Sequence, residues 1–548
     1  MIFVDRMIRP TAAVCLLVLA GSAPGCHQSP DQAQAASTDD VSVDRTTGDE
    51  DAATTSPVEF GPISEFGPIS KDDLPLQFPS ASKNPDPDAV DDLDNDTRPP
   101  GLIDTLRSTV AGSPIFEESG VQEELLENLV SGQDALTRIK RENRQAIREA
   151  NRQVRVGAAA GSPNIVLITI ERIGLGDFSC FREQDERTTP HVDALAARGL
   201  RFPNFYAGSA EPQAARWCLL TGLHVGHAPE DREQSSRYTL RREQQTIADV
   251  LWMAGYTTGF VGVWKERSLP IDHGFEEWSG LVEGVDPVSA YPEHIYVDAS
   301  RARLPANANG GTELLAADFL VEEGMSFISR RAAAGRPFYL HLAVCPELTA
   351  ASDDQADASE ILKELDSIIG RLTDWIDDSD VASHTCIVVA GESAPPSNEF
   401  ERLNESGRTR GLKCSADGLS DGNLRVPLIV VWPGRIGAGE SNEHVCGVWD
   451  LMPTFTDLAA ARRRPQRLDG ISIARSLMQQ TQREHVLLYW ETRNGGFGQA
   501  VRKGRWKGIR APRQSTLTLY DLLDDPAEQR DLAESRPDVV EELIVRRK

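Results

Sequence analysis

The stretch that decides the fold is NIVLITI at Asn164–Ile170, followed by the turn ERIGLGD at Glu171–Asp177. An apolar run of strand length that leads into glycines and acids is typical of an open α/β sheet, which places ligand groups at the carboxyl ends of its strands. The same region closes with PQAARWCLLTG at Pro212–Gly222. The sequence therefore predicts that Asn164–Gly222 supplies a strand, turns and a helix around a site.

Apolar, β-rich runs alternate with helical stretches through the rest of this region. The runs are Ile165–Ile170, Gly259–Gly262, Phe338–Val344, Thr385–Ala390 and Leu428–Val431, and the helical stretches are Thr189–Arg198, Thr246–Ala254, Glu313–Arg330 and Ala358–Ile376. This alternation predicts an α/β domain over residues 162–493, with a mixed, mostly parallel sheet sandwiched by helices. Residues 494–548 are predicted to form a smaller C-terminal α+β subdomain, with strands near Ala500–Arg502 and Trp506–Lys507 and a last helix from Pro526.

The first 26 residues have the pattern of an export signal. Arg6 and Arg9 precede an apolar stretch at Thr11–Gly21, and small residues lead to Cys26. The apolar stretch is too short to span a membrane as a helix. The end of the segment resembles a bacterial lipobox, so lipidation of Cys26 is favoured over plain cleavage. We expect an exported lipoprotein of the bacterial cell envelope or periplasm, whose only link to the membrane is this anchor.

Residues 27–100 are predicted to form an acidic, disordered linker. They hold 17 Asp and Glu against 4 Lys and Arg, within a chain of net charge −27, which argues against nucleic acid as a partner. Residues 101–160 are predicted to be helical, because apolar side chains recur there at helical spacing. Most of the six cysteines beyond Cys26 are expected to be buried thiols, since none of their spacings is typical of a metal or redox motif.

Five groups of short motifs, taken in chain order with the opening stretch, resemble the sulfatase family, which is arylsulfatase-like and belongs to the alkaline-phosphatase-like superfamily. They are TPHVDAL at Thr189–Leu195, TGLHVGH at Thr221–His227, AGYTTG at Ala254–Gly259, LRVP with WPG at Leu424–Pro427 and Trp432–Gly434, and LYDL with DP at Leu519–Leu522 and Asp525–Pro526. The resemblance implies the α/β fold already predicted. It also implies a sulfuric ester hydrolase that uses a formylglycine nucleophile and a calcium ion.

The nucleophile that the resemblance implies is missing. The family makes formylglycine from the Cys or Ser of C/S-x-P-x-R, and counting back from Arg216 places Pro212 at that position. Proline has neither a thiol nor a hydroxyl, so it cannot supply the nucleophile. Cys218 is expected to lie in the core, and Ser209 remains a minor alternative as a displaced nucleophile.

The implied calcium ligands are degenerate as well. The family's first pair of aspartates corresponds to Glu171 and Arg172, and the later pair corresponds to Glu392 and Ser393. A guanidinium cannot ligate a cation, so no calcium and no other cofactor is expected. We predict that Arg172 takes the place of the ion and neutralises Glu171 and Glu392. The alternative is that Arg172 turns outward.

The family's remaining cations are mostly replaced. No lysine follows AGYTTG in the expected place, because Gly262 is followed by Val263 and Trp264, and Glu347 stands where a histidine is usual. Lys413 lies in RGLK, which resembles the family's RGIK, but an ungapped count places Ala416 there instead. Arg216 and Lys413 are therefore the candidate survivors of the catalytic set.

Three functional readings follow from this pattern. The first is a sulfatase-like protein without catalytic activity, which binds or scaffolds at the cell envelope and has a sulfated carbohydrate or a protein as its partner. The second is an active arylsulfatase-like hydrolase with a non-standard site. The third is an assembly protein that binds partners through its acidic linker and helical segment.

Overall fold

The computed structural model describes residues 158–159, 161–182, 188–229, 237–297, 300–349, 358–395, 409–465, 467–493, 496–512, 514 and 516–544. All of them belong to one compact unit, Asp104–Lys548. The predicted signal peptide 1–26, the linker 27–100 and, apart from residues 158–159, the helical segment 101–160 lie outside the described residues. In the part that is described, no helix has the length and apolar character needed to cross a membrane.

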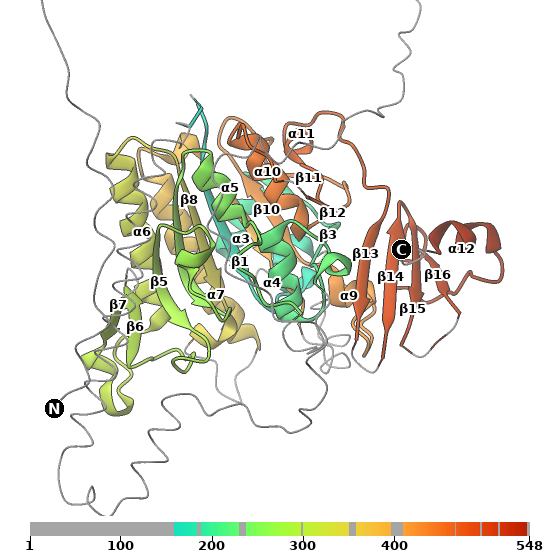
Figure 1. The fold of residues 1–548 in the computed structure, drawn as a ribbon, viewed down its shortest axis with the longest axis horizontal. Helices are drawn as coiled ribbons and strands as arrows, with labels where there is room; N and C mark the ends of the chain where they lie inside the picture. The colour runs from blue at the N-terminus through green and yellow to red at the C-terminus, as the bar shows by residue number, and fades with distance from the viewer. Residues whose placement is uncertain are drawn as a thin grey trace, which may run out of the picture. The chain divides into compact units, whose positions relative to one another are not determined.

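A ten-stranded sheet forms the centre of the domain, in the order β11-β2-β10-β9-β1-β8-β4-β5-β6-β7 (Figure 1). Its inner strands β9, β1, β8, β4 and β5 are parallel, whereas β10 and the β6–β7 hairpin are antiparallel to their neighbours. The strands are β1 (Asn164–Ile170), β2 (Leu200–Arg201), β4 (Thr257–Trp264), β5 (Glu277–Val282), β6 (His294–Val297), β7 (Ser300–Arg303), β8 (Phe338–Val344), β9 (Thr385–Gly391), β10 (Leu428–Val431) and β11 (Glu440–Ser441).

Helices cover both faces of this sheet, as the sequence predicted. The helices with described bounds are α3 (Pro190–Ala197), α4 (Pro212–Thr221), α5 (Ile247–Met253), α6 (Ala316–Ala333), α7 (Ala358–Asp377), α9 (Asp421–Leu424), α10 (Leu451–Leu458) and α11 (Ala474–Leu477). Strand β1 is buried on both sides: Ile165 and Leu167 belong to the core that includes α4, α5 and α10, while Val166, Ile168 and Ile170 belong to the core with α3, α6 and α7. This alternation follows from the two-residue period of a strand. The predicted fold class is thereby confirmed.

The C-terminal part is a separate four-stranded antiparallel sheet packed by one helix. It contains β13 (Leu488–Thr492), β14 (Gly498–Lys503), β15 (Trp506–Arg510) and β16 (Thr518–Asp521), with α12 at Pro537–Leu543 (Figure 1). Its first strand begins at Leu488, whereas the subdomain was predicted from residue 494. The last helix starts at Pro537 and not at Pro526. At Pro526 the chain turns instead, because the Asp525 carboxylate accepts the amide hydrogens of Gln529 and Arg530 at 2.8 Å each.

A buried ionic network joins this sheet to the central domain. The ammonium of Lys507 on β15 is fully buried and lies 2.7 Å from a carboxylate oxygen of Asp421 on α9 and 2.7 Å from one of Glu528. Asp421 also pairs with Arg425 at 2.8 Å and accepts the hydroxyl of Tyr206, which lies on β3 (Phe205–Tyr206), at 2.9 Å. Strand β3 itself pairs in parallel with β12 (Cys446–Gly447).

The cysteines behave as expected of core thiols. Five of those in the described residues are buried, Cys180 is partly buried, and none of the six is in a disulfide within the described part of the chain.

Candidate functional site

Charged side chains follow four neighbouring parallel strands at the points where the strands end. Glu171 follows β1, Lys265 and Glu266 follow β4, Glu347 follows β8, and Glu392 follows β9. Carboxyl ends of parallel strands meet at one edge of a sheet, which is where open α/β sheets bind ligands. Backbone hydrogen bonds fix this edge, from the amide of Glu171 to the carbonyl of Val344 at 3.1 Å and from the amide of Glu392 to that of Ile170 at 2.8 Å.

Helix α4 delivers the remaining cation to the same edge. Pro212 is its first residue, a position that suits proline because the helix makes no use of that amide hydrogen. Arg216 comes four residues later and therefore lies on the same face of the helix as Pro212. The side chain of Arg216 is 8 % exposed, and it extends into the group of glutamates.

Three buried glutamates surround two cations, and we call Glu171, Arg216, Lys265, Glu266 and Glu392 the charge cluster. Arg216 Nε lies 3.1 Å from Glu392 Oε1, its Nη2 lies 3.5 Å from Glu171 Oε2, and its Nη1 lies 3.9 Å from Glu266 Oε1. Lys265 Nζ lies 2.7 Å from Glu171 Oε2. The two cations share Glu171, so the cluster is paired internally.

The protonation of the glutamates differs across the cluster. Burial alone would raise the pKa of Glu171, but Arg216 and Lys265 outweigh that effect and hold its pKa below the ordinary value. Burial raises the pKa of Glu266 and of Glu392 to about 7, because Arg216 offsets the cost of burial only in part. With three carboxylates against two cations, these raised values fit a cluster that holds an extra proton near neutral pH.

The structure gives Arg172 a different partner from the one predicted. Its guanidinium bonds to the carboxylate of Glu347, and both side chains are about one third exposed. Arg172 contributes to the low pKa of Glu171, but its effect is smaller than those of Arg216 and Lys265. The place between Glu171 and Glu392 that was predicted for Arg172 belongs to Arg216, with Lys265 beside it. The reason is that the chain turns away after Glu171, with Arg172 at a φ of +58°.

Lys265 was missed by the sequence reasoning. The family motif predicts a lysine directly after Gly262, where this chain has Val263. The structure shows that strand β4 continues to Trp264, so that a lysine two residues further along reaches the same edge of the sheet. The signal was available in the sequence, because Lys265 and Glu266 directly follow the apolar run and mark the end of the strand.

Lys413 lies elsewhere, against the C-terminal sheet. Its ammonium is 3.4 Å from the backbone carbonyl of Glu528 and 5.5 Å from the centre of the Tyr520 ring. It lines an open pocket of about 420 Å³ with residues of the 411–413 and 527–529 segments. Among the contacts of the described residues, none joins Lys413 to the charge cluster.

The other two candidate nucleophiles have no support from their surroundings. The thiol of Cys218 is fully buried, and burial together with Asp469 raises its pKa well above the ordinary value. Ser209 is buried, and its hydroxyl accepts the amide hydrogen of Glu211 at 3.1 Å. Within the described residues, no histidine, lysine or carboxylate contacts that hydroxyl to act as a base.

The residues at the sheet edge do not fit a calcium ion. Calcium takes six to eight oxygen ligands, and its ligands must be free to face the ion. Here Glu171 and Glu392 face cations, and the hydroxyl of the buried Ser393 accepts the amide hydrogen of Arg172 at 3.1 Å. Two permanent positive charges in the same space would repel a divalent cation.

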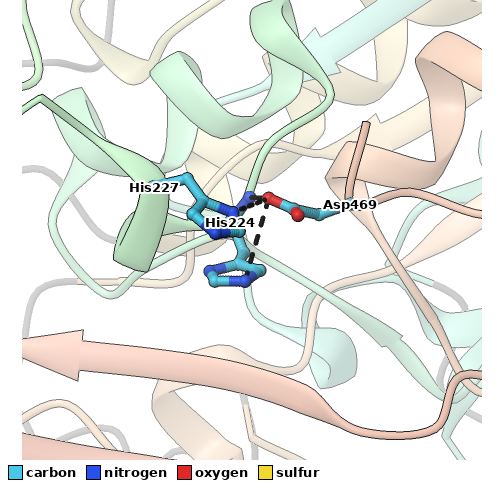
Figure 2. A group of neighbouring side chains, drawn as sticks. All are labelled: His224, His227 and Asp469. Carbon is cyan, nitrogen blue, oxygen red and sulfur yellow. Dashed lines mark hydrogen bonds and ion pairs between the residues drawn. The ribbon is translucent and has the colours of Figure 1, made fainter. Parts of the chain in front are cut away.

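A second cluster combines two histidines and an aspartate, at the C-terminal end of α4. His227 Nδ1 lies 2.6 Å and His224 Nε2 lies 3.8 Å from Asp469 Oδ2, and Figure 2 shows both rings beside that carboxylate. This composition suits a transition metal. However, His224 Nδ1 accepts the amide hydrogen of Gly226 at 3.1 Å, so that the proton of the neutral ring is on Nε2, toward Asp469. The hydrogen bonding therefore fits a proton-sharing group and not a metal site.

Two regions of the chain match models of known protein families. Residues 163–345 match the family model described as sulfatase, and residues 419–545 match the model described as N-sulphoglucosamine sulphohydrolase, C-terminal. The first region contains β1, α4 and β8, and the second contains the C-terminal sheet. A curated relative is arylsulfatase A of Bos taurus, which is 28 % identical over 446 residues, covering 71 % of this chain and 86 % of the relative.

Solved structures share the fold. Ps i-CgsB, determined in complex with k-i-k-neocarrahexaose, aligns with a TM-score of 0.60 and 21 % identity over 70 % of this chain and 91 % of that one. The structure of BT4656 in complex with its substrate D-glucosamine-2-N,6-O-disulfate aligns with a TM-score of 0.55 and 18 % identity, over 70 % of this chain and 96 % of that one.

Proposed function

We propose that this chain, which belongs to the sulfatase family, uses the family's fold to bind a sulfated carbohydrate without hydrolysing it. The observation that carries the proposal is Pro212, which is the first residue of α4 and corresponds, by the count back from Arg216, to the nucleophile of the family motif. A proline there has no atom that could attack sulfur. The side chains nearby offer no replacement, because Cys218 is an inert core thiol and Ser209 has no base among the described residues.

The charge cluster supports the same conclusion from its electrostatics. Arg216 is kept, but it is engaged by Glu171 and Glu392, so its charge is already compensated inside the protein. Catalysis of sulfate ester hydrolysis needs positive groups directed at the charge that develops on the sulfate oxygens. A cluster with three carboxylates and two cations does not present such a field.

The ligand class is proposed from the family relationship. One structural neighbour was solved with its substrate D-glucosamine-2-N,6-O-disulfate, and another was solved in complex with k-i-k-neocarrahexaose. Lys413 is the candidate contact of this chain, because it is an exposed cation beside the Tyr520 ring in an open pocket. A lysine next to an aromatic ring suits the charged and apolar faces of a sulfated sugar.

The binding experiment uses retention of the protein on a sulfated polysaccharide column, with elution by salt. Lys413→Ala should elute at a lower salt concentration than wild type. Lys503→Ala is the matched control, because Lys503 is also an exposed lysine of the C-terminal part but pairs with Glu542. Equal elution of wild type and Lys413→Ala would remove Lys413 from the proposal, and no retention of wild type would contradict carbohydrate binding.

The alternative function, an active hydrolase with a non-standard site, is tested with a chromogenic aryl sulfate. We expect no turnover above a blank without protein. Turnover by the wild type that disappears in Arg216→Ala would establish the alternative and overturn the proposal. Turnover that survives in Arg216→Ala would identify a contaminating enzyme.

We also propose that the protein acts at the cell envelope, attached through a lipid on Cys26. This rests on the sequence of the first 26 residues. Labelled palmitate should be incorporated into the wild type and not into Cys26→Ser. Equal labelling of both would contradict the anchor. If protein partners are captured only by chains that contain residues 101–160, the result would favour an assembly protein over a carbohydrate-binding protein.

A further inference from the structure

Three nitrogen atoms of the loop that follows α4 lie near one carboxylate oxygen. Asp469 Oδ2 lies 2.6 Å from His227 Nδ1 and 3.8 Å from His224 Nε2, and it accepts the backbone amide hydrogen of His224 at 3.0 Å. The backbone around Asp469 also donates hydrogen bonds to the end of α4. The carbonyl of Gly222, which caps α4, accepts the amide hydrogens of Asp469 at 3.1 Å and Gly470 at 3.3 Å.

The same group touches the C-terminal sheet. The centroid of the His224 ring is 4.4 Å from that of the His227 ring and 5.3 Å from that of the Tyr489 ring on β13. Gly226 is packed so closely that a Cβ atom there would meet Tyr489 at 2.8 Å. The three side chains therefore join the end of the helix that carries Pro212 and Arg216 to the loop at residue 469 and to the first strand of the second sheet.

The hydrogen bonds and charges around His224 depend on whether its ring is protonated. Two stacked imidazoles lie beside one carboxylate, and His224 Nδ1 accepts the amide hydrogen of Gly226 at 3.1 Å, so a proton on that nitrogen would remove the hydrogen bond. The other charged and titratable groups that act on His224 are Glu491 on β13 and Arg467, which oppose each other. Tyr489 packs against the ring, and Cys218 on α4 lies within the field of Asp469.

We propose that His224, His227 and Asp469 form a proton-operated clasp, which is closed while His224 Nδ1 accepts the amide hydrogen of Gly226 and is loosened when that nitrogen takes up a proton. Opening the clasp would release the 223–227 loop and reduce its contact with β13. The clasp thus couples acidification to the junction between helix α4 and the C-terminal sheet.

The direction of the pH effect follows from His224. Burial lowers the pKa of His224 below its ordinary value of 6.5, and Asp469 only partly offsets this. A histidine whose pKa is lower in the folded state stabilises the fold fully above the ordinary value, and that contribution is lost as the pH falls toward the folded value. The His224 imidazolium is also harder to form beside His227, because like charges this close repel each other.

Two measurements on the full chain test the clasp. The first is a titration of the histidine Cε1 protons by NMR, with assignment from His224→Gln and His227→Gln. We expect the midpoint of His224 to rise when His227 is replaced, because the competing charge is gone. Midpoints that do not change when the partner is removed would overturn the proposal.

The second measurement is hydrogen exchange of the segments 223–227 and 467–471, corrected for the intrinsic effect of pH. Exchange should increase by about tenfold on acidification in the wild type and in His191→Gln, a control in which a half-exposed histidine near Asp374 is removed. The increase should vanish in His224→Gln, which cannot titrate. Equal increases in His224→Gln and wild type would contradict the clasp.

A zinc titration completes the test, because a metal would compete with the protons. The hydrogen bond from Gly226 predicts no zinc binding by calorimetry. Zinc binding by the wild type that is lost in His227→Gln would show that the group is a metal site and would overturn the proposal.

Discussion

Replacing Lys265 by methionine removes one charge from the charge cluster while keeping the length of the side chain. Lys265 Nζ lies 2.7 Å from Glu171 Oε2, and the two side chains are 8 % and 9 % exposed. Removing the ammonium therefore leaves a buried carboxylate with one of its two cations. Methionine fills the same volume, so any loss of stability reports the charge and not a cavity.

The size of the loss can be bounded from the geometry. Breaking a buried ion pair by removing one partner costs about 3–5 kcal/mol, because the other charge remains buried. Arg216 remains 3.5 Å from Glu171 and keeps part of the compensation, which places the expected loss at the lower end, about 3 kcal/mol. In a domain of this size each kcal/mol moves the melting temperature by about 1–2 °C, so Lys265→Met should melt about 3–6 °C below wild type.

Thermal unfolding at neutral pH measures this effect, with two companion variants. Lys503→Met removes a half-exposed lysine that pairs with an exposed Glu542, and it should change the melting temperature by less than about 1 °C. Adding Glu171→Gln to Lys265→Met removes the unpaired charge and should restore at least part of the loss. If Lys265→Met and Lys503→Met are equally stable, Lys265 is not the buried countercharge that the structure places there.

Three further predictions concern the same charged groups. The pKa values of Glu266 and Glu392 are raised from 4.5 to about 7, so the folded state binds protons that the unfolded chain has released, and stability should fall as the pH rises from 4.5 through 7. Glu266→Gln stays neutral, so its melting temperature should fall less steeply over this pH range. A slope equal to that of wild type would refute this prediction. Calcium at about 5 mM, or EDTA, should shift the melting temperature of the wild type by less than about 1 °C, whereas a calcium-dependent rise that Glu171→Gln abolishes would show that the carboxylates hold the ion. Lys507→Met should lower the free energy of unfolding by about 3–5 kcal/mol, because it leaves Asp421 and Glu528 with one buried cation fewer. Hydrogen exchange should show the loss of protection first in β13–β16. Protection there equal to wild type would contradict a role of this network in joining the sheet to the central domain.

Five strands of the central sheet, β1, β4, β8, β9 and β10, could be predicted from the sequence because they are buried on both faces, whereas the buried strand β5 was not predicted. The run Leu428–Val431 is both predicted and observed as strand β10, and the run at Ile165–Ile170 differs from β1 by one residue. The edge hairpin β6–β7 was not predicted, since its exposed side chains, such as those of Arg301 and Arg303, give no apolar pattern. The last helix was predicted from Pro526, but it begins at Pro537, and proline suits the first position of a helix.

Residues of the candidate site could be predicted only where they belong to one short sequence motif. Pro212 and Arg216 were predicted to lie near each other because of their fixed spacing in the motif, and the structure places both on α4. The partner of Arg172 could not be read from the sequence, since Glu347 is 175 residues away and becomes a neighbour through the pairing of β1 with β8. The same holds for Asp469 and His227, which are 242 residues apart. Such contacts depend on tertiary structure and leave no local pattern.

The measurement that tests the central claim most directly is the release of inorganic sulfate from a sulfated oligosaccharide, followed by ion chromatography over a long incubation with the purified full chain. The fold is present but Pro212 cannot attack sulfur, so wild type and Arg216→Ala should both release no more sulfate than a blank without protein. Sulfate released by the wild type in proportion to protein concentration, and absent with Arg216→Ala, would show a working active site and contradict the account.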